Sequence, residues 1–514
     1  MLVYTCEQMR VIEENADVNG YPYYEMMKTA GSRCADKIHS VLVGASSTSE
    51  SVTVLCGAGK NGGDGFIIAG KLCDRGYHVR IVLVDGYPSA HESKLAYSSL
   101  EDKPIIVSDL KNNYDTCVNA CLSSAGIVDC VFGIGFHGTL RKEIADFFND
   151  ISDSRAKKFA VDIPSGLEGN GGEITGAYFK TDYTLAITCY KPVHIVKPAA
   201  EVCGIVYMID IGVDKKCYQA VGSRVVVSAD FSEVKQFFKP RNADSHKGDY
   251  GRLLSIAGSY TMQGAAVMAA NAAINSGVGI VECVFPDMAY PAIASKVTEA
   301  LMAPMRSTSD GFLSVSNLNA ILNKVQKSTA VLIGCGLGVN RDTTQIVEAV
   351  LKNTDKPVII DADGINILAR NINILKETSA SVIITPHPGE MSRLTGKSVE
   401  EIQSDRIKAA RDFAGEYGCM VVLKGANTVV SGPSGSVYIN QTGNAGMATG
   451  GSGDVLAGII SSFVCQGMGI QASTISGVFV HGLCGDTVRD KYSMHGVTPT
   501  RMINELAGVL SNFE

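Results

Sequence analysis

Short apolar runs that alternate with helical segments restrict most strongly how this chain can fold. The first series of runs covers residues 51–56, 79–84, 126–131, 159–163 and 183–188. The second series covers residues 253–257, 278–285, 330–333, 357–361, 381–385 and 420–424. This order is typical of βαβ units, in which the strands form a mainly parallel sheet covered by helices. We therefore predict two three-layer α/β/α domains.

The alternation breaks near residues 212–223, and 514 residues are too many for a single hydrophobic core. We predict a first domain over 1–212, a linker over 213–224 and a second domain over 225–514. Ahead of the first strand, residues 6–43 have helical periodicity with a break at 20–23. Their apolar faces suggest an oligomer contact, so we expect a homo-oligomer.

Charge and cysteine usage exclude several classes of protein. The net charge of −7 argues against a nucleic-acid partner, which normally requires a basic face. We find no uninterrupted apolar stretch long enough to span a bilayer and no basic patch for a membrane surface. The 15 cysteines are scattered singly, without a C-x-x-C pair, and no apolar signal core follows Met1. We expect reduced thiols and a cytoplasmic protein.

The first chemical motif is the glycine-rich run from Gly57 to Gly65, between the strand at 51–56 and a helix expected at 66–75. Such a loop lets backbone amides and a helix N-terminus approach an anion. The run also fits G-x-G-x-x-G, with Asp85 near the position of a ribose-binding acid, as in a dehydrogenase. No catalytic His or Lys motif in the second half supports that alternative. A turn that serves only packing would not explain Asn61 and Asp64.

Two further strand ends carry polar groups. Asp129 precedes the loop Gly133–Thr139, and Asp162 is followed by Pro164, Ser165 and Gly166. Ligands bind beyond the carboxyl ends of the strands in open parallel sheets. We therefore expect these loops to converge on one crevice.

Together these motifs resemble the YjeF N-terminal family of NAD(P)H-hydrate epimerases over residues 1–212, with a Rossmann-like fold. The resemblance implies that Asn61, Asp129 and Ser165 hold K⁺, and we expect Asp162 to be catalytic, because a carboxylate near the hydrated ring can assist ring opening or proton transfer. Family members usually have Asn in place of Lys60, which adds a positive charge beside the ligand. The residues implied to contact the hydrated nucleotide are Lys60, Asn61, Gly62, Gly63, Asp64, Gly133, Ile134, Gly135, Phe136, His137, Gly138, Thr139 and Asp162.

The second half contains the run Thr449-Gly-Gly-Ser-Gly453-Asp454, which opens into an apolar helix. Its amides suit an anion hole for a transferring phosphoryl group, and Asp454 is placed to accept a proton from an attacking hydroxyl. Asp454 could instead only cap the helix, but a cap does not require the surrounding glycines. The turn resembles the ribokinase-like superfamily.

Four more strand-end or flanking loops narrow the resemblance to the NAD(P)H-hydrate dehydratase (YjeF C-terminal) family over about 225–514. These loops are Ser-His-Lys-Gly at 245–248, Gly-Cys-Gly-Leu-Gly at 334–338, Thr-Pro-His-Pro-Gly-Glu at 385–390 and Lys-Gly-Ala-Asn-Thr at 424–428. The resemblance implies substrate contacts from Ala265, Gly338, His387 and Asp454, and nucleotide contacts from Lys424, Gly425, Ala426, Asn427, Thr428 and Gly453. A purely structural, hydrogen-bonded role for His387 stays open. No histidine has zinc spacing.

The two families act on the same damaged metabolites, the R and S hydrates of NAD(P)H. The joint resemblance implies an epimerase that converts R to S, and a dehydratase that restores NAD(P)H from S while ADP becomes AMP and phosphate. Mg²⁺ would bridge the nucleotide phosphates. One alternative is a ribokinase-like small-molecule kinase, and another makes the first domain a non-catalytic binding or dimerisation module.

Overall fold

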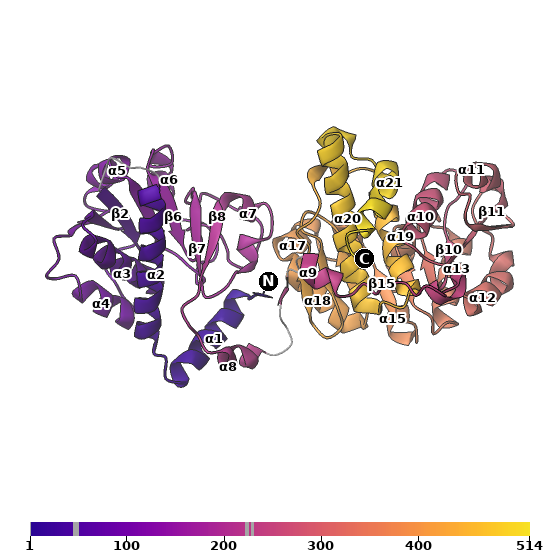
Figure 1. Ribbon diagram of the computed structural model, residues 1–514, viewed down its shortest axis with the longest axis horizontal. Coiled ribbons are helices and arrows are strands. Elements are labelled where there is room, and N and C mark those ends of the chain that lie inside the picture. Colours follow the sequence, from indigo (N-terminus) through magenta and orange to yellow (C-terminus); the bar gives the residue numbers. More distant parts are fainter. Residues whose placement is uncertain (1, 45–50, 222–225, 228–230) are drawn as a thin grey trace. The chain divides into compact units, whose positions relative to one another are not determined.

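The computed structural model describes residues 2–44, 51–221, 226–227 and 231–514 (Figure 1). The chain divides into two compact units, Leu2–Val225 and Val226–Glu514, with Met1 assigned to the second. Part of the predicted linker 213–224 is folded, because α8 (Lys215–Tyr218) and η2 (Gln219–Val221) contact α1 (Cys6–Val18). Residues 222–224 of that predicted linker lie outside the described residues.

The first unit is built on a fully parallel sheet in the order β4-β3-β2-β5-β6-β7-β8. Its strands are β2 (Ser51–Cys56), β3 (His78–Leu83), β4 (Ile106–Asp109), β5 (Gly126–Cys130), β6 (Lys157–Val161), β7 (Tyr183–Ile187) and β8 (Ile205–Ile209). Its helices besides α1 and α8 are α2 (Tyr23–Gly44), α3 (Lys60–Asp74), α4 (His91–Ser98), α5 (Tyr114–Leu122), α6 (Lys142–Asp150) and α7 (Ala199–Val202). The order reverses between β2 and β5, which creates a topological switch point.

Alternation along the strands explains the helical layers of this unit. Val52 and Val54 of β2 pack in one core with α2 and α3, whereas Leu55 packs in another with α5 and α6. The apolar side chains of α2, including Met26 and Met27, are buried in the unit's own core. These side chains therefore need no partner chain for their burial, and the homo-oligomer stays a prediction.

The second unit contains a larger, mostly parallel sheet, in which the strands from β9 onward follow the order β9-β18-β17-β16-β15-β14-β13-β10-β11-β12. Only β17 runs antiparallel to its neighbours among these strands. The strands are β9 (Val226–Val227), β10 (Arg252–Ile256), β11 (Ile280–Pro286), β12 (Leu301–Met305), β13 (Ala330–Ile333), β14 (Val358–Ile360), β15 (Val382–Ile384), β16 (Met420–Leu423), β17 (Val429–Ser431) and β18 (Val437–Ile439).

The longest helix of this unit, α20 (Ile470–Lys491), belongs to the C-terminal part of the sequence, which is drawn yellow in Figure 1. α10 and α19 pack against each other and share a core with the central strands. The helices are α9 (Phe231–Lys235), α10 (Gln263–Asn275), α11 (Tyr290–Ala294), α12 (Leu318–Gln326), α13 (Arg341–Lys352), α14 (Asp363–Leu368), α15 (Ile374–Glu377), α16 (Pro388–Thr395), α17 (Val399–Ser404), α18 (Arg406–Tyr417), α19 (Ser452–Cys465), α20 (Ile470–Lys491) and α21 (Pro499–Leu510).

These features confirm the predicted pair of α/β folds. The predicted strands at 51–56 and 330–333 coincide with β2 and β13, and the other predicted strands overlap observed ones with shifted ends. The helix predicted at 66–75 was wrong at its start, because α3 begins at Lys60. All 15 cysteines are free and all but Cys73 are buried. None of the helices in the described ranges is long and apolar enough to span a membrane.

Candidate functional site

The first candidate site lies at the switch point of the first sheet. The glycine-rich run follows β2, the loop 133–139 follows β5, and Asp162 follows β6. These three strands are consecutive neighbours in the sheet, so their carboxyl ends open at one edge. The structure thus brings together the loops that the sequence predicted to converge.

The start of α3 is packed so closely that only glycine fits at one position. A Cβ on Gly62 would lie 1.9 Å from the carbonyl oxygen of Gly57. Gly59, the N-cap residue, provides no side-chain cap, so the first amides of α3 keep the donor capacity that an anion requires. The ammonium group of Lys60 lies 3.4 Å from the ring centroid of Tyr23, a cation–π contact. The Lys60 side chain therefore packs on α2, while its backbone forms the first residue of α3.

Asp162 is fixed by a network that sequence reasoning missed. Its φ of 67° lies in the left-handed region, which is unusual for a residue other than glycine. Its carboxylate forms a buried ion pair with Lys191, whose ammonium also donates to the carbonyl of Ile187 at 2.7 Å. Nδ1 of His194 accepts from the backbone N–H of Lys191 at 3.0 Å, so Nε2 donates to the Asp162 carbonyl at 2.8 Å. Burial lowers the pKa of His194 to about 4, so this ring is neutral.

The residues predicted to hold K⁺ are joined through the backbone of Phe132. Asn61 donates to the carbonyl of Phe132 at 2.8 Å, and the N–H of Phe132 donates to Oγ of Ser165 at 2.9 Å. Ser165 in turn donates to the Asp129 carboxylate at 2.7 Å. Burial raises the pKa of Asp129 to about 6, despite these donors. The amide, carboxylate and hydroxyl oxygens suit a hard cation, so the site fits the predicted ion, which stays a prediction.

The loop 133–139 reaches the site at its first residue. A Cβ on Gly133 would lie 3.3 Å from Oδ2 of Asp162 and 3.5 Å from Cγ of Asn61. Farther along, the N–H of Gly138 donates to Glu168 at 2.8 Å, and the largely exposed His137 lies 3.9 Å from the same carboxylate. The structure therefore places Gly133 beside Asp162 and ties the far end of the loop to Glu168.

The second candidate site lies at the carboxyl ends of β13, β14 and β16 and at the start of α19. Asp454 is in the first turn of α19, and burial together with nearby Asp361 raises its pKa to about 7. The partly buried ammonium of Lys424 lies 2.9 Å from Oδ1 of Asp361 and 3.7 Å from Glu390. A Cβ on Gly453 would lie 3.2 Å from that ammonium. Because residue 453 is glycine, the predicted anion-binding turn at the start of α19 can lie close to Lys424.

Cys335, Asp361 and Asp454 form one compact group. One ligand atom from each lies within 4.8 Å of the others, which is the only such His, Cys, Asp or Glu group found among the described residues. Asp361 is already neutralised by Lys424, and a sulfur ligand does not suit Mg²⁺. These three side chains alone are therefore poorly suited to bind Mg²⁺. A Mg²⁺ ion bound mainly by nucleotide phosphates, as predicted, is consistent with this.

The predicted substrate contacts of the second unit occupy neighbouring loops. The N–H of Gly338 donates to Asp363 at 2.8 Å, and a Cβ on Gly336 would lie 2.9 Å from Ala265. His387 caps α16, since its Nδ1 accepts from the backbone of Gly389 at 3.0 Å. Burial and the charge of Lys424 lower the pKa of His387. Its capping role is therefore observed, while its substrate contact stays a prediction.

The predicted nucleotide loop 424–428 is held by Arg406, which sequence reasoning also missed. The buried Arg406 guanidinium donates to the carbonyls of Leu423 at 2.9 Å and Ala426 at 2.5 Å. Asn427 has a φ of 53° and donates to the carbonyl of Asn440 at 3.1 Å. Thr428 donates to the carbonyl of Gly425 at 3.1 Å. Lys424 pairs with Asp361, and its charge also acts on Asp454, so it lies with these carboxyl groups as well as in this loop.

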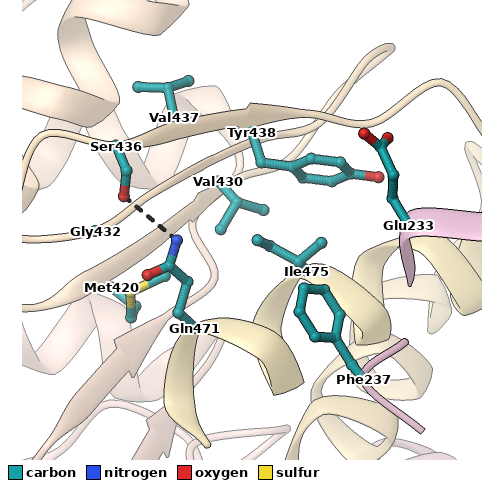
Figure 2. Close-up of a pocket in the computed structure, with 10 residues that line it drawn as sticks. All are labelled: Glu233, Phe237, Met420, Val430, Gly432, Ser436, Val437, Tyr438, Gln471 and Ile475. Carbon is teal, nitrogen blue, oxygen red and sulfur yellow. Dashed lines mark hydrogen bonds between the residues drawn. The ribbon is translucent and has the colours of Figure 1, made fainter. Parts of the chain in front are cut away.

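A pocket of about 230 Å³ lies at the opposite end of β16, beside β17 and β18 (Figure 2). Gln471 of α20 donates to Oγ of Ser436 across it at 3.4 Å. Met420, the first residue of β16, lines it, whereas Lys424 follows the other end of the same strand. No predicted site residue lines this pocket, so the predicted chemistry lies elsewhere.

Comparison with known proteins covers both units. A family model described as NAD(P)H-hydrate dehydratase matches residues 253–507, and one described as YjeF-related protein N-terminus matches residues 23–193. The bifunctional NAD(P)H-hydrate repair enzyme Nnr of Thermofilum pendens is 34% identical over 504 residues, covering 97% of this chain and 94% of that protein. The enzyme of the same name from Moorella thermoacetica is 33% identical, covering 96% and 93%.

A solved structure also matches the second half. The ADP/ATP-dependent NAD(P)H-hydrate dehydratase from Bacillus subtilis, co-crystallised with ATP and Mg²⁺, is 32% identical with a TM-score of 0.49. The match covers 55% of this chain and 97% of that chain.

Proposed function

This chain belongs to the family of bifunctional NAD(P)H-hydrate repair enzymes, and we propose that its two units catalyse successive repair steps. The first unit interconverts the R and S hydrates of NADH and NADPH. The second unit dehydrates the S form, while ADP is converted to AMP and phosphate. The free, buried cysteines support the proposed cytoplasmic location.

The position and ionisation of Asp454 carry the proposal for the second unit. A carboxyl with a pKa of about 7 can accept a proton at neutral pH. Asp454 takes the proton of the C6 hydroxyl as the hydroxyl oxygen attacks the terminal phosphorus of ADP. The ring nitrogen lone pair then expels phosphate, and loss of a proton from C5 restores the ring double bond. Nearby Lys424 and the amides around Gly453 stabilise the transferring phosphoryl group.

Mg²⁺ is proposed to enter with the nucleotide. When bound, it neutralises charge on the phosphates. Lys424–Thr428 and Gly453 are proposed to contact the nucleotide, and Ala265, Gly338 and His387 to contact the hydrate. ADP, rather than ATP, is the proposed co-substrate because fused members of the family generally use it.

In the first unit we place the hydrated ring beside Asp162. The ion pair with Lys191 holds this carboxylate, and the hydrogen bond from His194 to the Asp162 carbonyl holds its backbone, at the carboxyl edge of the sheet. The start of α3 and the loop 133–139 are proposed to bind the nucleotide part. K⁺ is proposed at Asn61, Asp129 and Ser165, where its charge would fix the backbone of the loop that carries Gly133.

Pure S hydrate supplied with Mg²⁺ and ADP tests the dehydratase proposal against the small-molecule kinase. We expect NADH, AMP and phosphate in equal amounts, measured by absorbance and by chromatography of the nucleotides. Consumption of nucleotide with a stable phosphorylated alcohol and no NADH would support the kinase and refute the proposal.

A further inference from the structure

Helix α1 forms one wall of the first candidate site. Nη2 of Arg10 donates to the carbonyl of Ile134 at 3.3 Å, so the helix lies against the loop 133–139. The thiol of Cys189, two residues before Lys191, contacts Sδ of Met9 at 3.0 Å. The helix therefore reaches the loops on both sides of Asp162.

Glu13 lies on the same face of α1 as these two contacts. It follows Arg10 by three positions and Met9 by four, the spacings at which helical side chains are neighbours. Its side chain is only partly exposed, whereas the adjacent Glu14 is exposed. Glu13 precedes the residues 23–193 that the N-terminal family model matches, so that match assigns it no role.

The surroundings of Glu13 are those of a functional carboxyl group. Within the described ranges we find no hydrogen bond or ion pair from its partly exposed carboxylate, so no protein partner holds this group. Burial and the charge of Asp162 raise the pKa of Glu13 to about 7. Glu13 interacts electrostatically with several charged or titratable groups. They are Arg10, Tyr23, Lys60, Asp64, Asp162, Cys189 and Lys191.

Resting on the proposed epimerase function, we infer that Glu13 is the acid that gives a proton to the C6 oxygen of the hydrated ring. The C6–O bond breaks with its electron pair on oxygen, water departs, and the ring nitrogen lone pair forms a C6=N iminium. Water then adds to the other face of C6, and Asp162 accepts its proton. The proton returns from Asp162 to Glu13 through solvent, so the cycle balances without a further reactant.

The charge distribution favours this cationic route. Asp162 and Asp64 lie near Glu13, and the charge of Asp162 also acts on Asp64. Burial and the charge of Asp162 raise the pKa of Asp64 well above its usual value, so carboxyl groups are crowded at this edge. Once Glu13 has given up its proton, its carboxylate would stabilise a positively charged iminium, whereas an anionic intermediate would be repelled.

Glu13→Gln keeps the shape of the side chain and removes the acid. We expect kcat for interconversion of purified R and S NADH hydrates to fall by about 100-fold or more, with little change in KM. Glu14→Gln makes the same change of charge on an exposed neighbour and should stay within about twofold of the unmodified chain. Dehydration of S hydrate by the same protein should be unchanged in both variants. Glu13→Asp keeps an acid on α1 and should recover part of the lost rate, which a folding defect would not explain.

Two further readouts separate proton transfer from a structural role. Because the acid must carry its proton, kcat of the unmodified epimerase should fall as pH rises through about 7, and Glu13→Gln should lose this limb.

In ¹⁸O-labelled water, each epimerisation should place solvent oxygen on C6. Retention of the original oxygen, or a Glu13→Gln rate equal to that of the unmodified chain, would overturn the inference. An unmodified chain that does not interconvert the hydrates would instead refute the proposed epimerase function.

Discussion

At the scale of single residues, each candidate site contains a carboxyl group beside a strand end or a helix start, in buried surroundings. Asp454 lies in the first turn of α19, where the helix dipole favours a negative charge. Burial and nearby Asp361 nevertheless raise its pKa to about 7. Asp162 is instead held by the buried ammonium of Lys191. Each site therefore has a carboxyl group that its buried surroundings hold in place.

The pH dependence of the dehydratase tests the role of Asp454. A base must be ionised, so kcat with S hydrate and ADP should rise with pH through about 7 and then level off. Asp454→Asn should lower kcat by about 100-fold to 10,000-fold. Asp490→Asn, at an exposed position near the end of α20, is the control and should behave like the unmodified chain. A rate in Asp454→Asn within a few-fold of normal would exclude a role for this carboxylate in proton transfer.

The sequence predicted residues that follow strands or open helices better than the residues that hold them. Asp162 and Asp454 were found because they adjoin Ser-Gly or Gly-rich turns at element ends. Lys191 binds Asp162 from 29 residues away, and Arg406 reaches Ala426 from 20 residues away. Such partners are fixed by tertiary packing, so no local pattern identified them. Asp361 directly follows β14 and could have been found by the same strand-end rule.

At the scale of elements, the central strands and the long helices were predictable because they are apolar and regular. β4 and β8 were missed because they are edge strands with partly exposed, mixed sequences. The start of α3 was missed because glycines usually weaken helices. Here Gly62 is required by its close approach to the backbone of Gly57, and this packing overrides the propensity.

The packing of α19 on α10 provides a test at this scale. A Cβ on Gly458 would lie 2.3 Å from the carbonyl oxygen of Ala269, so Gly458→Ala should force the helices apart. We expect unfolding of the second unit to be easier by about 1–3 kcal/mol, with a lower dehydratase rate because Asp454 lies one turn earlier. Gly508→Ala, at an open position of α21, should instead stabilise the unit by about 0.5–1 kcal/mol. Thermal unfolding of both variants measures this, and equal effects would contradict the packing argument.

At the scale of the whole molecule, each unit has its own sheet and its own candidate site. The first site is built from the carboxyl ends of β2, β5 and β6, and the second from those of β13, β14 and β16 with the start of α19. The residues named for one site all belong to one unit. The two proposed reactions are thus chemically linked by the hydrate alone.

Recovery of NADH from a mixture of R and S NADH hydrate, with ADP, Mg²⁺ and K⁺, tests the central claim most directly. The unmodified chain should return the whole mixture to NADH, as measured by absorbance. Asp162→Asn should stop at the S share, apart from the slow uncatalysed epimerisation, because the second unit accepts only that form. Recovery by the unmodified chain that stops at the S share, or no recovery at all, would contradict two-step repair.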